Sequence, residues 1–570
     1  MHNSEQLDVV LDKKSLASHV FITGSTGSGK SNTIYKLLSE ANKSNCKFLV
    51  IEPAKGEYKN VFGTHSYIQR DNAGNYIIDD NKEYKRLSED GIAKVYSTNP
   101  VIADLLKINP FSFKEKIHIL EHLDRLVEIF NVCWPMYAAM PAVLKEAVEK
   151  SYEDAGWDLT TSENRYKKRL YPTFADVTRN IRSIIDSSEY DAENKGAYKG
   201  SLITRLKSLT NGINGQIFTT DEISDEQLFN ENVIIDLSRV GSSETKSLIM
   251  GLLILKLQEY RMTQGKMNAD LNHITVLEEA HNLLKRTSTE ISSESANLLG
   301  KSVEMLTNAI AEMRTYGEGF IIADQAPELL DMAVIRNTNT KIIMRLPDLS
   351  DRELVGRAAN LNDNQIEELA KLPCGVAAVY QNEWVQPVLC KIEQYRVEDD
   401  SKFEYKLPQN SDTSINLLKN RIEMANALCK ISQNTNKIED LKTHLEKHLM
   451  NTALYKFSGT LYAFSMQYID STRKKPDYNK LDSIVSDLLP EFLKTCKDSA
   501  VKNPGKVEVW RNDLQENIED VLKVLHMEND IDLRNSILQC ILQNYILKEL
   551  NKPQLLNELL QKKHSKEELW

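Results

Sequence analysis

Short apolar runs alternate with longer amphipathic segments along most of the chain before residue 397. The first two runs, "HVFITG" (19–24) and "KFLVIEP" (47–53), flank a segment with helical spacing that begins at Ser31. Further apolar runs lie at 232–238, 273–281, 319–325, 340–346 and 375–381. Runs of this length predict strands, and their alternation with helix-length segments predicts an α/β fold, with a mostly parallel sheet flanked by helices.

A different pattern begins at about residue 113, where strand-like runs stop and apolar residues recur at helical spacing, as in "IHILEHLDRLVEIF" (117–130). Because strand-like runs resume later, we predict a mainly helical insertion at 113–230, inside a first domain that spans 1–397. Amphipathic segments with almost no strand pattern fill 398–570, which predicts a separate, all-helical C-terminal domain. The apolar faces of its helices either pack on one another or dock another protein.

A glycine-rich turn, "GSTGSGKS" (24–31), lies between the first predicted strand and helix and matches the pattern G-x-x-x-x-G-K-[ST]. Its glycines let successive backbone N–H groups surround phosphate oxygens, and the helix N-terminus adds partial positive charge. We therefore predict that Lys30 reaches the β- and γ-phosphates of ATP and that Ser31 ligates Mg²⁺. A chance glycine turn is the alternative, and the Lys-Ser ending after a strand counts against it. The predicted nucleotide-binding residues are Gly24, Ser25, Thr26, Gly27, Ser28, Gly29, Lys30, Ser31 and Asn32.

Carboxylates are also expected where later strands end. "HITVLEEAHNLL" (273–284) places Glu278 and Glu279 directly after an apolar run. Glu278 would hold Mg²⁺ through water, and Glu279 would act as the general base that polarises the attacking water. A solvated acidic turn is the alternative. Asp236 ends another run and is either a neighbour of the site or a strand cap, and Glu52 is expected close to the site.

Composition narrows the class of protein. The formal net charge of −11 excludes an overall basic field, so any contact with nucleic acid must be local. The 7 cysteines form no C-x-x-C pair, so neither a disulfide framework nor a zinc site is indicated, and a reduced cytoplasm fits. The N-terminus lacks the apolar core of a signal peptide, and no run approaches the roughly 18 apolar residues of a membrane span. The most apolar helical segment, 247–260, is too short and is predicted to be a buried helix.

Several segments, taken together and in order, resemble the motifs of HerA-type ATPases, which belong to the HerA and FtsK group of ring-forming DNA motors. The resemblance covers about 11–392. It implies a RecA-like core, a homo-hexameric ring with ATP bound between subunits, and duplex DNA threaded through the centre. The segments that carry it are Gly24–Ser31, Val50–Tyr58, Ile108–Phe111, Val233–Lys246, Leu277–Leu284, Met313–Phe320, Ala323–Pro327 and Leu372–Val379.

The resemblance also implies roles for two further catalytic residues. Gln325 matches the polar sensor that contacts the γ-phosphate, and Arg314 matches an arginine placed at the nucleotide interface. An arginine supplied across a subunit boundary would couple hydrolysis around a ring. For Arg314, an ordinary surface arginine is the alternative.

Two features differ from the usual pattern of this family. HerA-like proteins usually carry a small β-barrel ahead of the first strand, whereas only residues 1–18 precede it here, so the barrel is absent or the chain is a truncated product. The acid pair is Glu-Glu where Asp-Glu is commoner in motors. The extra methylene moves the magnesium-binding carboxylate slightly, and hydrolysis is expected to survive.

Contact with DNA has two candidate segments. The stretch 285–302 is rich in Ser and Thr and predicts a mobile loop near the pore, and 194–209 carries four cations, Lys195, Lys199, Arg205 and Lys207. Either could touch phosphates, whose binding is driven by charge and independent of sequence. A solvated helix face and a flexible loop are the alternatives.

Two functions of different classes follow. The first is an ATP-driven translocase or helicase on duplex DNA that feeds a nuclease or similar partner, in anti-phage defence or DNA processing. The second is an ATPase ring that serves as scaffold and switch for a nuclease or NAD-consuming effector, without processive movement along DNA. The set of Lys30, Ser31, Glu278 and Glu279 predicts ATP turnover with Mg²⁺ in both cases.

Overall fold

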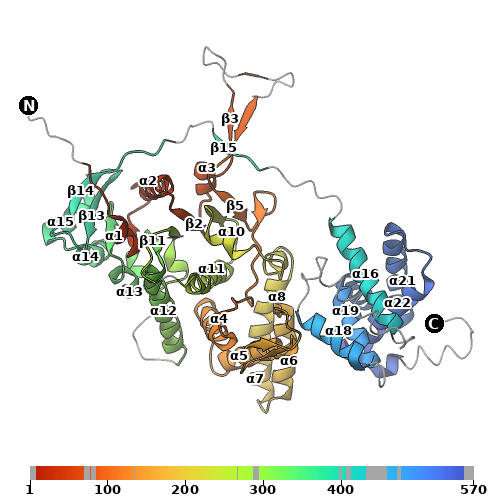
Figure 1. The fold of residues 1–570 in the computed structure, drawn as a ribbon. Coiled ribbons are helices and arrows are strands. Elements are labelled where there is room, and N and C mark those ends of the chain that lie inside the picture. The colour runs from red at the N-terminus through yellow and green to blue at the C-terminus, as the bar shows by residue number, and fades with distance from the viewer. Residues whose placement is uncertain are drawn as a thin grey trace, which may run out of the picture. The chain divides into compact units, whose positions relative to one another are not determined.

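The computed structural model contains two compact units, and each is described by itself (Figure 1). The first unit comprises Met1–Ala147 and Ile181–Leu407, and the second comprises Val148–Asn180 and Pro408–Trp570. The structure describes residues 8–69, 77–78, 85–134, 136–265, 267–286, 294–396, 401–405, 413–431, 459–471 and 477–556.

A ten-stranded sheet forms the centre of the first unit. Neighbouring strands from β12 to β6 run parallel, whereas β13 and β14 pair antiparallel at one edge. The predicted α/β fold with a mostly parallel sheet is therefore confirmed. From one edge to the other, the strands are β14 (Val388–Lys391), β13 (Val376–Gln381), β12 (Thr340–Ile343), β1 (Val20–Thr23), β11 (Glu318–Asp324), β10 (His273–Glu278), β2 (Lys47–Glu52), β9 (Val233–Asp236), β5 (Lys94–Ser97) and β6 (Asp104–Leu105).

Helices cover both faces of this sheet (Figure 1). The helices α2 (Lys30–Lys43) and α3 (Tyr58–Phe62) lie on one face, and α11 (Ser243–Thr263) and α12 (Glu294–Glu312) lie on the other. Because both faces are covered, β1, β9, β10 and β11 are buried along their whole length, which explains their nearly continuous apolar runs. Helix α11 is buried over most of its surface because α4 (Ile119–Cys133) packs on it from outside, so the predicted buried helix is confirmed.

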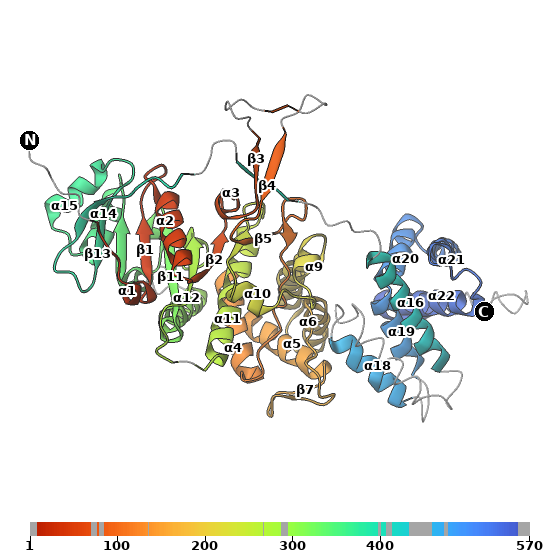
Figure 2. The ribbon, with the colours of Figure 1, turned by 45° about the horizontal axis from the view of Figure 1, so that its top comes forward.

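A small three-stranded sheet stands away from the large one (Figure 2). It consists of β15 (Lys402–Phe403), β3 (His65–Ile68) and β4 (Arg86–Glu89), all paired antiparallel. The sequence pattern did not predict these strands, nor β5, β6 and β14. They are short, and β14 is largely exposed at the edge of the sheet, so none of them needs a long apolar run.

Helices occupy most of the segment 113–230. Besides α4, they are α5 (Met140–Asp154), α6 (Phe174–Ser187), α7 (Ala192–Tyr198), a π-helix at Lys199–Ile203, α8 (Thr204–Thr210), α9 (Asn214–Ile217) and α10 (Asp225–Phe229). The only strands described within this segment are the two-residue hairpin strands β7 (Trp157–Asp158) and β8 (Glu163–Asn164).

The second unit is built from helices around one apolar core that includes Trp510, Leu514 and Ile537. The segment Val148–Asn180 belongs to this unit as well: Leu170 joins its core, and the backbone N–H of Gly459 donates to the Tyr171 carbonyl. No helix described in either unit is long and apolar enough to cross a membrane. The helices of the C-terminal segment are α16 (Thr413–Ile431), α18 (Gly459–Ser471), α19 (Tyr478–Leu488), α20 (Pro490–Lys502), α21 (Val507–Val524), α22 (Ile531–Asn544) and a π-helix at Tyr545–Glu549.

A buried ionic cluster connects α11 to the amino-terminal ends of the central strands β10 and β11. The fully buried Glu318 carboxylate accepts hydrogen bonds from Arg261 Nε at 2.9 Å and from Thr275 Oγ1 at 2.7 Å, and it contacts His273 Nδ1 at 2.7 Å. Arg261 is itself only 5% exposed and also donates to the Phe229 carbonyl at 2.7 Å. Each charge in this cluster thus depends on its partners.

Replacing Glu318 with Leu should destabilise the first unit strongly, because Arg261 would keep its buried charge without a counter-ion. We expect a loss of about 3–5 kcal/mol in the free energy of unfolding, measured by urea denaturation. The control is Glu368→Gln, which breaks an exposed pair with Lys371 and should change stability by less than about 1 kcal/mol. Similar losses in both variants would show that the cluster does not hold Arg261.

Candidate nucleotide-binding site

The glycine-rich turn after β1 has the open shape that a phosphate group needs. Its tip, Thr26 and Gly27, is exposed, and Gly29 has φ 111°, a left-handed conformation that favours glycine. A Cβ atom on Gly24 would lie 2.6 Å from Ser28 Oγ and 2.8 Å from Met344 Cβ, so only glycine fits where the turn leaves the strand. At the tip, nothing lies within 4 Å of the position that a Cβ atom on Gly27 would take, so phosphate oxygens can approach the backbone there.

Lys30 is folded back over this turn. Its ammonium group donates to the Gly24 carbonyl and lies 3.5 Å from the Ser25 carbonyl. Partial burial lowers its pKa, and the nearby charge of Glu279 opposes that effect. A cation held by weak carbonyl acceptors at the base of the turn can exchange them for phosphate oxygens, so the residues present fit the triphosphate of ATP.

The predicted acid pair lies at the carboxyl end of β10, two strands from β1. Glu278 is 8% exposed, and its Oε1 accepts a hydrogen bond from the hydroxyl of Tyr58 at 2.7 Å. Burial raises the pKa of Glu278. The Ser31 hydroxyl and this carboxylate are oxygen donors, the type that Mg²⁺ prefers, so the donor set fits the metal.

Glu279 has an unusual backbone conformation, with φ 45° and ψ 51° in the left-handed region. For a residue other than glycine this costs on the order of 1–3 kcal/mol, and such strain is concentrated at functional sites. The sharp turn takes Glu279 out of the strand direction, and its carboxylate accepts a hydrogen bond from Gln325 Nε2 at 2.6 Å.

Gln325 connects the glycine-rich turn to the acid pair. Its Oε1 accepts a hydrogen bond from Thr26 Oγ1 at 2.7 Å, while its amide nitrogen donates to Glu279. These bonds join segments that are 299 and 46 residues apart in sequence. Three residues predicted separately as phosphate-binding, sensor and base are therefore directly linked, which we call the Thr26–Gln325–Glu279 chain.

Sequence reasoning missed Asp324, the last residue of β11. It is fully buried and accepts hydrogen bonds from both the backbone N–H and Nδ1 of His281, each at 2.9 Å. This hydrogen bond raises the pKa of His281. Donor atoms of Glu279, His281 and Asp324 all lie within 4.8 Å of one another, so this group could also hold a cation. The position of Asp324 after an apolar strand run was the available signal.

Three carboxylates end adjacent strands on the face of the sheet that α2 covers. Glu52, Asp236 and Glu278 each lie two residues after a buried residue that packs in the core with α2, and therefore on the same face; these residues are Val50, Ile234 and Val276. Glu52 and Asp236 are direct neighbours in the register of β2 and β9. The site thus contains an acidic cluster that is almost completely shielded from water.

The segment 53–59 after β2 supplies hydrogen-bond donors and a counter-ion to this acidic cluster. The backbone N–H groups of Glu57 and Tyr58 donate to Glu52 at 2.7 and 3.3 Å, and Lys59 forms an ion pair with Asp236 at 2.5 Å. Although burial alone would raise the pKa of Asp236, the hydrogen bonds of Lys59 and Ser238 lower it. Burial raises the pKa of Glu52 to about 8, with its carboxylate neighbours adding to the effect. This shift favours the protonated form of Glu52 at neutral pH, against the backbone N–H donors, which favour the ionised form.

Two predicted residues are not brought to the turn. Arg314 lies in the 3₁₀ turn Met313–Tyr316 before β11, whereas Gln325 follows the other end of that seven-residue strand, about 20 Å away. Arg314 is exposed and cannot reach a nucleotide held by its own chain. The Asn32 side chain points away from the turn as well, since it donates to the Glu393 carbonyl and accepts from the Tyr395 N–H.

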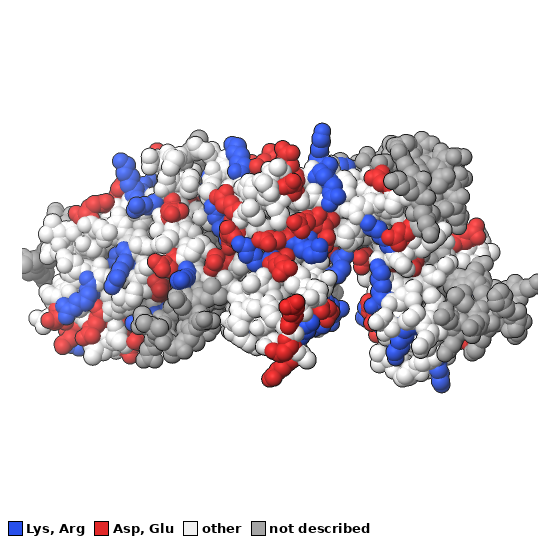
Figure 3. Space-filling model, turned by 90° about the horizontal axis from the view of Figure 1, so that it is seen from below, with Lys and Arg blue, Asp and Glu red and all other residues white. Residues whose placement is uncertain are grey.

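The segments suggested for DNA contact have other structural roles. Of the stretch 285–302, residues 287–293 lie outside the described part, and residues from 294 onward belong to α12 instead of the expected loop. Lys195 and Lys199 bond to Asp186, and Arg205 lies 3.7 Å from Glu244. On the face seen in Figure 3, the described Lys and Arg side chains lie among Asp and Glu, without a broad area of one charge.

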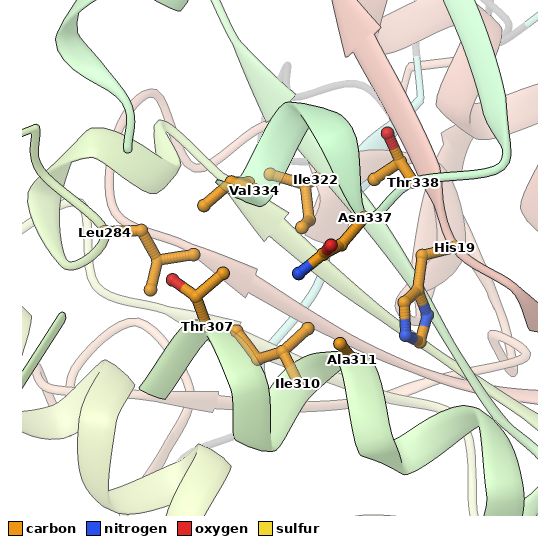
Figure 4. Close-up of a pocket in the computed structure, with 9 residues that line it drawn as sticks. All are labelled: His19, Leu284, Thr307, Ile310, Ala311, Ile322, Val334, Asn337 and Thr338. Carbon is orange, nitrogen blue, oxygen red and sulfur yellow. The ribbon is translucent and has the colours of Figure 1, made fainter. Parts of the chain in front are cut away.

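A small cavity lies on the face of the sheet that α12 covers (Figure 4). Its volume, as swept by the centre of a water-sized sphere, is about 10 Å³, which is room for about one water molecule. It is therefore too small for a nucleotide. The lining residues are His19, Leu284, Thr307, Ile310, Ala311, Ile322, Val334, Asn337 and Thr338.

Comparison with known proteins agrees with the motifs. Residues 1–257 match the family model described as the central domain of helicase HerA. The chain is 22% identical over 393 residues to the DNA double-strand break repair helicase HerA of Sulfurisphaera tokodaii, across 68% of this chain and 67% of that protein. It is 24% identical over 398 residues to a probable helicase of Methanocaldococcus jannaschii, across 68% of each. Among solved structures, VirB4 of Thermoanaerobacter pseudethanolicus has a TM-score of 0.47 and 17% identity, covering 68% of this chain and 94% of that one. The sequence matches confirm the resemblance found in the motifs.

The raised pKa of Glu52 predicts a specific dependence of stability on pH. Between the ordinary pKa of 4.5 and the folded value of about 8, the folded chain keeps a proton that the unfolded chain releases. The contribution of Glu52 to the free energy of unfolding is thus complete at low pH and declines as pH rises through this range, by at most about 1.4 kcal/mol per pH unit.

Glu52→Gln should therefore lose stability less steeply than the unmodified chain when urea denaturation is repeated across this pH range. The control is Glu57→Gln, whose half-exposed carboxylate lies in the same segment and should leave the slope unchanged. Equal slopes for Glu52→Gln and the unmodified chain would mean that Glu52 is ionised in the folded protein.

Proposed function

We propose that this chain, a HerA-type P-loop ATPase, hydrolyses ATP with Mg²⁺ in a ring of six copies and acts as a translocase or helicase on duplex DNA. In this proposal a nuclease or other effector partner processes the DNA, in anti-phage defence or another form of DNA processing. The observation that carries the ATPase site is the Thr26–Gln325–Glu279 chain, because it links the turn that would hold phosphate to a carboxylate able to accept a proton.

Most of the predicted residues have a place in the proposed reaction. Bound Mg-ATP supplies the electrophilic γ-phosphate. Lys30 and the backbone of the turn bind the phosphate oxygens, and Ser31 and Glu278 hold the metal. Glu279 accepts the proton of the attacking water, and Gln325 orients that water or the γ-phosphate through its amide. Asp324 fixes His281 beside Glu279, at 3.6 Å from its carboxylate, and is added to the site as a positioning residue.

The proposed ring assigns Arg314 to the site of a neighbouring copy. Within its own chain this arginine is exposed before the amino-terminal end of β11, whereas the turn lies at the other end of the strands. The cations that act on the Glu278 carboxylate within one chain include Lys55 and Lys30, and neither of these two is an arginine. A cation from a second copy would complete the charge stabilisation of the transition state.

An alternative function is favoured by the charge of the chain. Its net charge is −11, and three of the four cations suggested for DNA contact are engaged with acidic or carbonyl groups. A ring that turns over ATP as scaffold and switch for a nuclease or NAD-consuming effector would need no DNA-binding surface. The helicase names of the relatives favour the first function, and a direct measurement separates the two.

ATP turnover of the purified protein, with and without linear duplex DNA at low and moderate salt, decides between them. The particle mass is recorded in the same samples. Strong stimulation by DNA of a particle with the mass of a ring supports the translocase. Steady turnover that ignores DNA supports the switch, and a monomeric particle with full turnover contradicts the ring in both versions.

Glu279→Gln should trap bound ATP, because proton acceptance is lost while the phosphate contacts remain. We expect turnover to fall by at least about 100-fold with nucleotide affinity retained, as measured by steady-state hydrolysis and binding of a fluorescent ATP analogue. Lys30→Ala should instead weaken binding itself. The control is Lys36→Ala, a lysine further along α2 that pairs with Glu393. Unchanged turnover in Glu279→Gln would remove Glu279 from the proposed mechanism.

Mixing two inactive variants tests the role of Arg314 across the subunit boundary. Arg314→Ala and Glu279→Gln should each have little activity alone. Rings co-assembled from both should regain part of it, because some sites combine an intact Glu279 with an intact Arg314 from the next copy. If the mixed rings are as inactive as the separate ones, Arg314 acts within its own chain or not at all.

A further inference from the structure

Two tyrosines lie between the two residues assigned to the metal. Tyr35 is on α2, one helical turn after Ser31, and Tyr58 is the first residue of α3. Tyr58 is 1% exposed, and Tyr35 packs against the same core. Neither residue has a role in the proposed chemistry so far, and neither was singled out in the sequence.

Each tyrosine contacts one of the metal-side residues. The Tyr58 hydroxyl donates to Glu278 Oε1 at 2.7 Å, and the Tyr35 hydroxyl lies near the Ser31 side chain. The two rings meet edge to face, with centroids 5.0 Å apart and planes at 83°. The path from Glu278 through Tyr58 and Tyr35 toward Ser31 thus comprises one hydrogen bond, one ring contact and the proximity of Tyr35 to Ser31.

The surroundings of the rings hold them in place. Phe62 packs edge to face on Tyr35 at 5.9 Å, and the backbone of Tyr58 is bonded to the buried Glu52. A buried ring has only two side-chain torsions, so packing on this scale leaves the hydroxyl little freedom. The positions of both hydroxyls are thus set by the core before any ligand binds.

We propose that Tyr35 and Tyr58 are positioning residues that preset Ser31 and Glu278 for Mg²⁺, an inference that rests on the proposed ATPase function. Tyr58 binds Oε1 alone, so the other carboxylate oxygen of Glu278 stays available to a metal while the side chain is held in place. A serine hydroxyl has one donor and two acceptor lone pairs, so Ser31 can donate toward Tyr35 and keep its lone pairs for a metal. Outer partners of this kind orient the ligands that they bond.

The test compares Tyr58→Phe, Tyr35→Phe and the unmodified chain by titrating Mg²⁺ into protein with a fluorescent ATP analogue. We expect the Mg²⁺ concentration at half-maximal Mg-dependent binding to rise by about tenfold in Tyr58→Phe and by a smaller factor in Tyr35→Phe. Binding of the analogue in the presence of EDTA should stay unchanged, because the phosphate contacts of Lys30 and the turn remain.

The control is Tyr260→Phe in α11, away from the turn. It removes a hydroxyl that accepts a hydrogen bond from Asn230, and it should leave the Mg²⁺ titration unchanged. Thermal unfolding confirms that each variant is folded, and Tyr35→Phe decides the matter if Tyr58→Phe is not. An unchanged Mg²⁺ midpoint, or an equal loss of binding in EDTA, would overturn the inference. If the unmodified chain binds no analogue even with Mg²⁺, the proposed function fails instead.

Discussion

The structure depends on one constraint: the carboxyl ends of the parallel strands all lie at the same end of the sheet. Side chains alternate between the two faces, so Glu52, Asp236 and Glu278 arrive on the same face at the ends of three adjacent strands. Neighbouring strands lie only about 4.8 Å apart, and three negative charges at that spacing without water would repel strongly. The remedies are different: a proton for Glu52, the ammonium of Lys59 for Asp236, and a tyrosine hydroxyl for Glu278.

The short segment 53–59 contributes hydrogen-bond donors or a cation to all three carboxylates, so it is more important to the site than its length suggests. Its N–H groups bind one carboxylate, its lysine a second and its tyrosine a third. On the other face, Asp324 ends β11 and holds His281, while Gln325 continues past the strand to the turn. The two faces of the sheet thus divide the work, with the groups assigned to the metal on one and the neighbours of Glu279 on the other.

Sequence patterns predicted the parts that depend on local chemistry. The continuous apolar runs gave seven strands of the central sheet at nearly their observed positions, because strands covered on both faces must be apolar throughout. The glycine pattern and the acids at strand ends indicated the site because each depends on residues that are close together in the sequence. The roles of Tyr58, Lys59 and Asp324 were not visible, because each depends on strands that are far apart in sequence becoming neighbours. The opposite placement of Arg314 and Gln325 follows from the single strand between them, which the apolar run 319–325 already indicated.

The position of β1 in the sheet has a consequence for folding while the chain is synthesised on the ribosome. Both partners of this strand, β11 and β12, are synthesised after it, since they begin about 300 residues later in the chain. At ordinary rates of synthesis that interval is about 15 to 60 s. During it, a fully apolar strand with two unpaired edges must be kept from other chains, by chaperones or by transient burial. The nucleotide site therefore comes into being only when most of the first unit has left the ribosome.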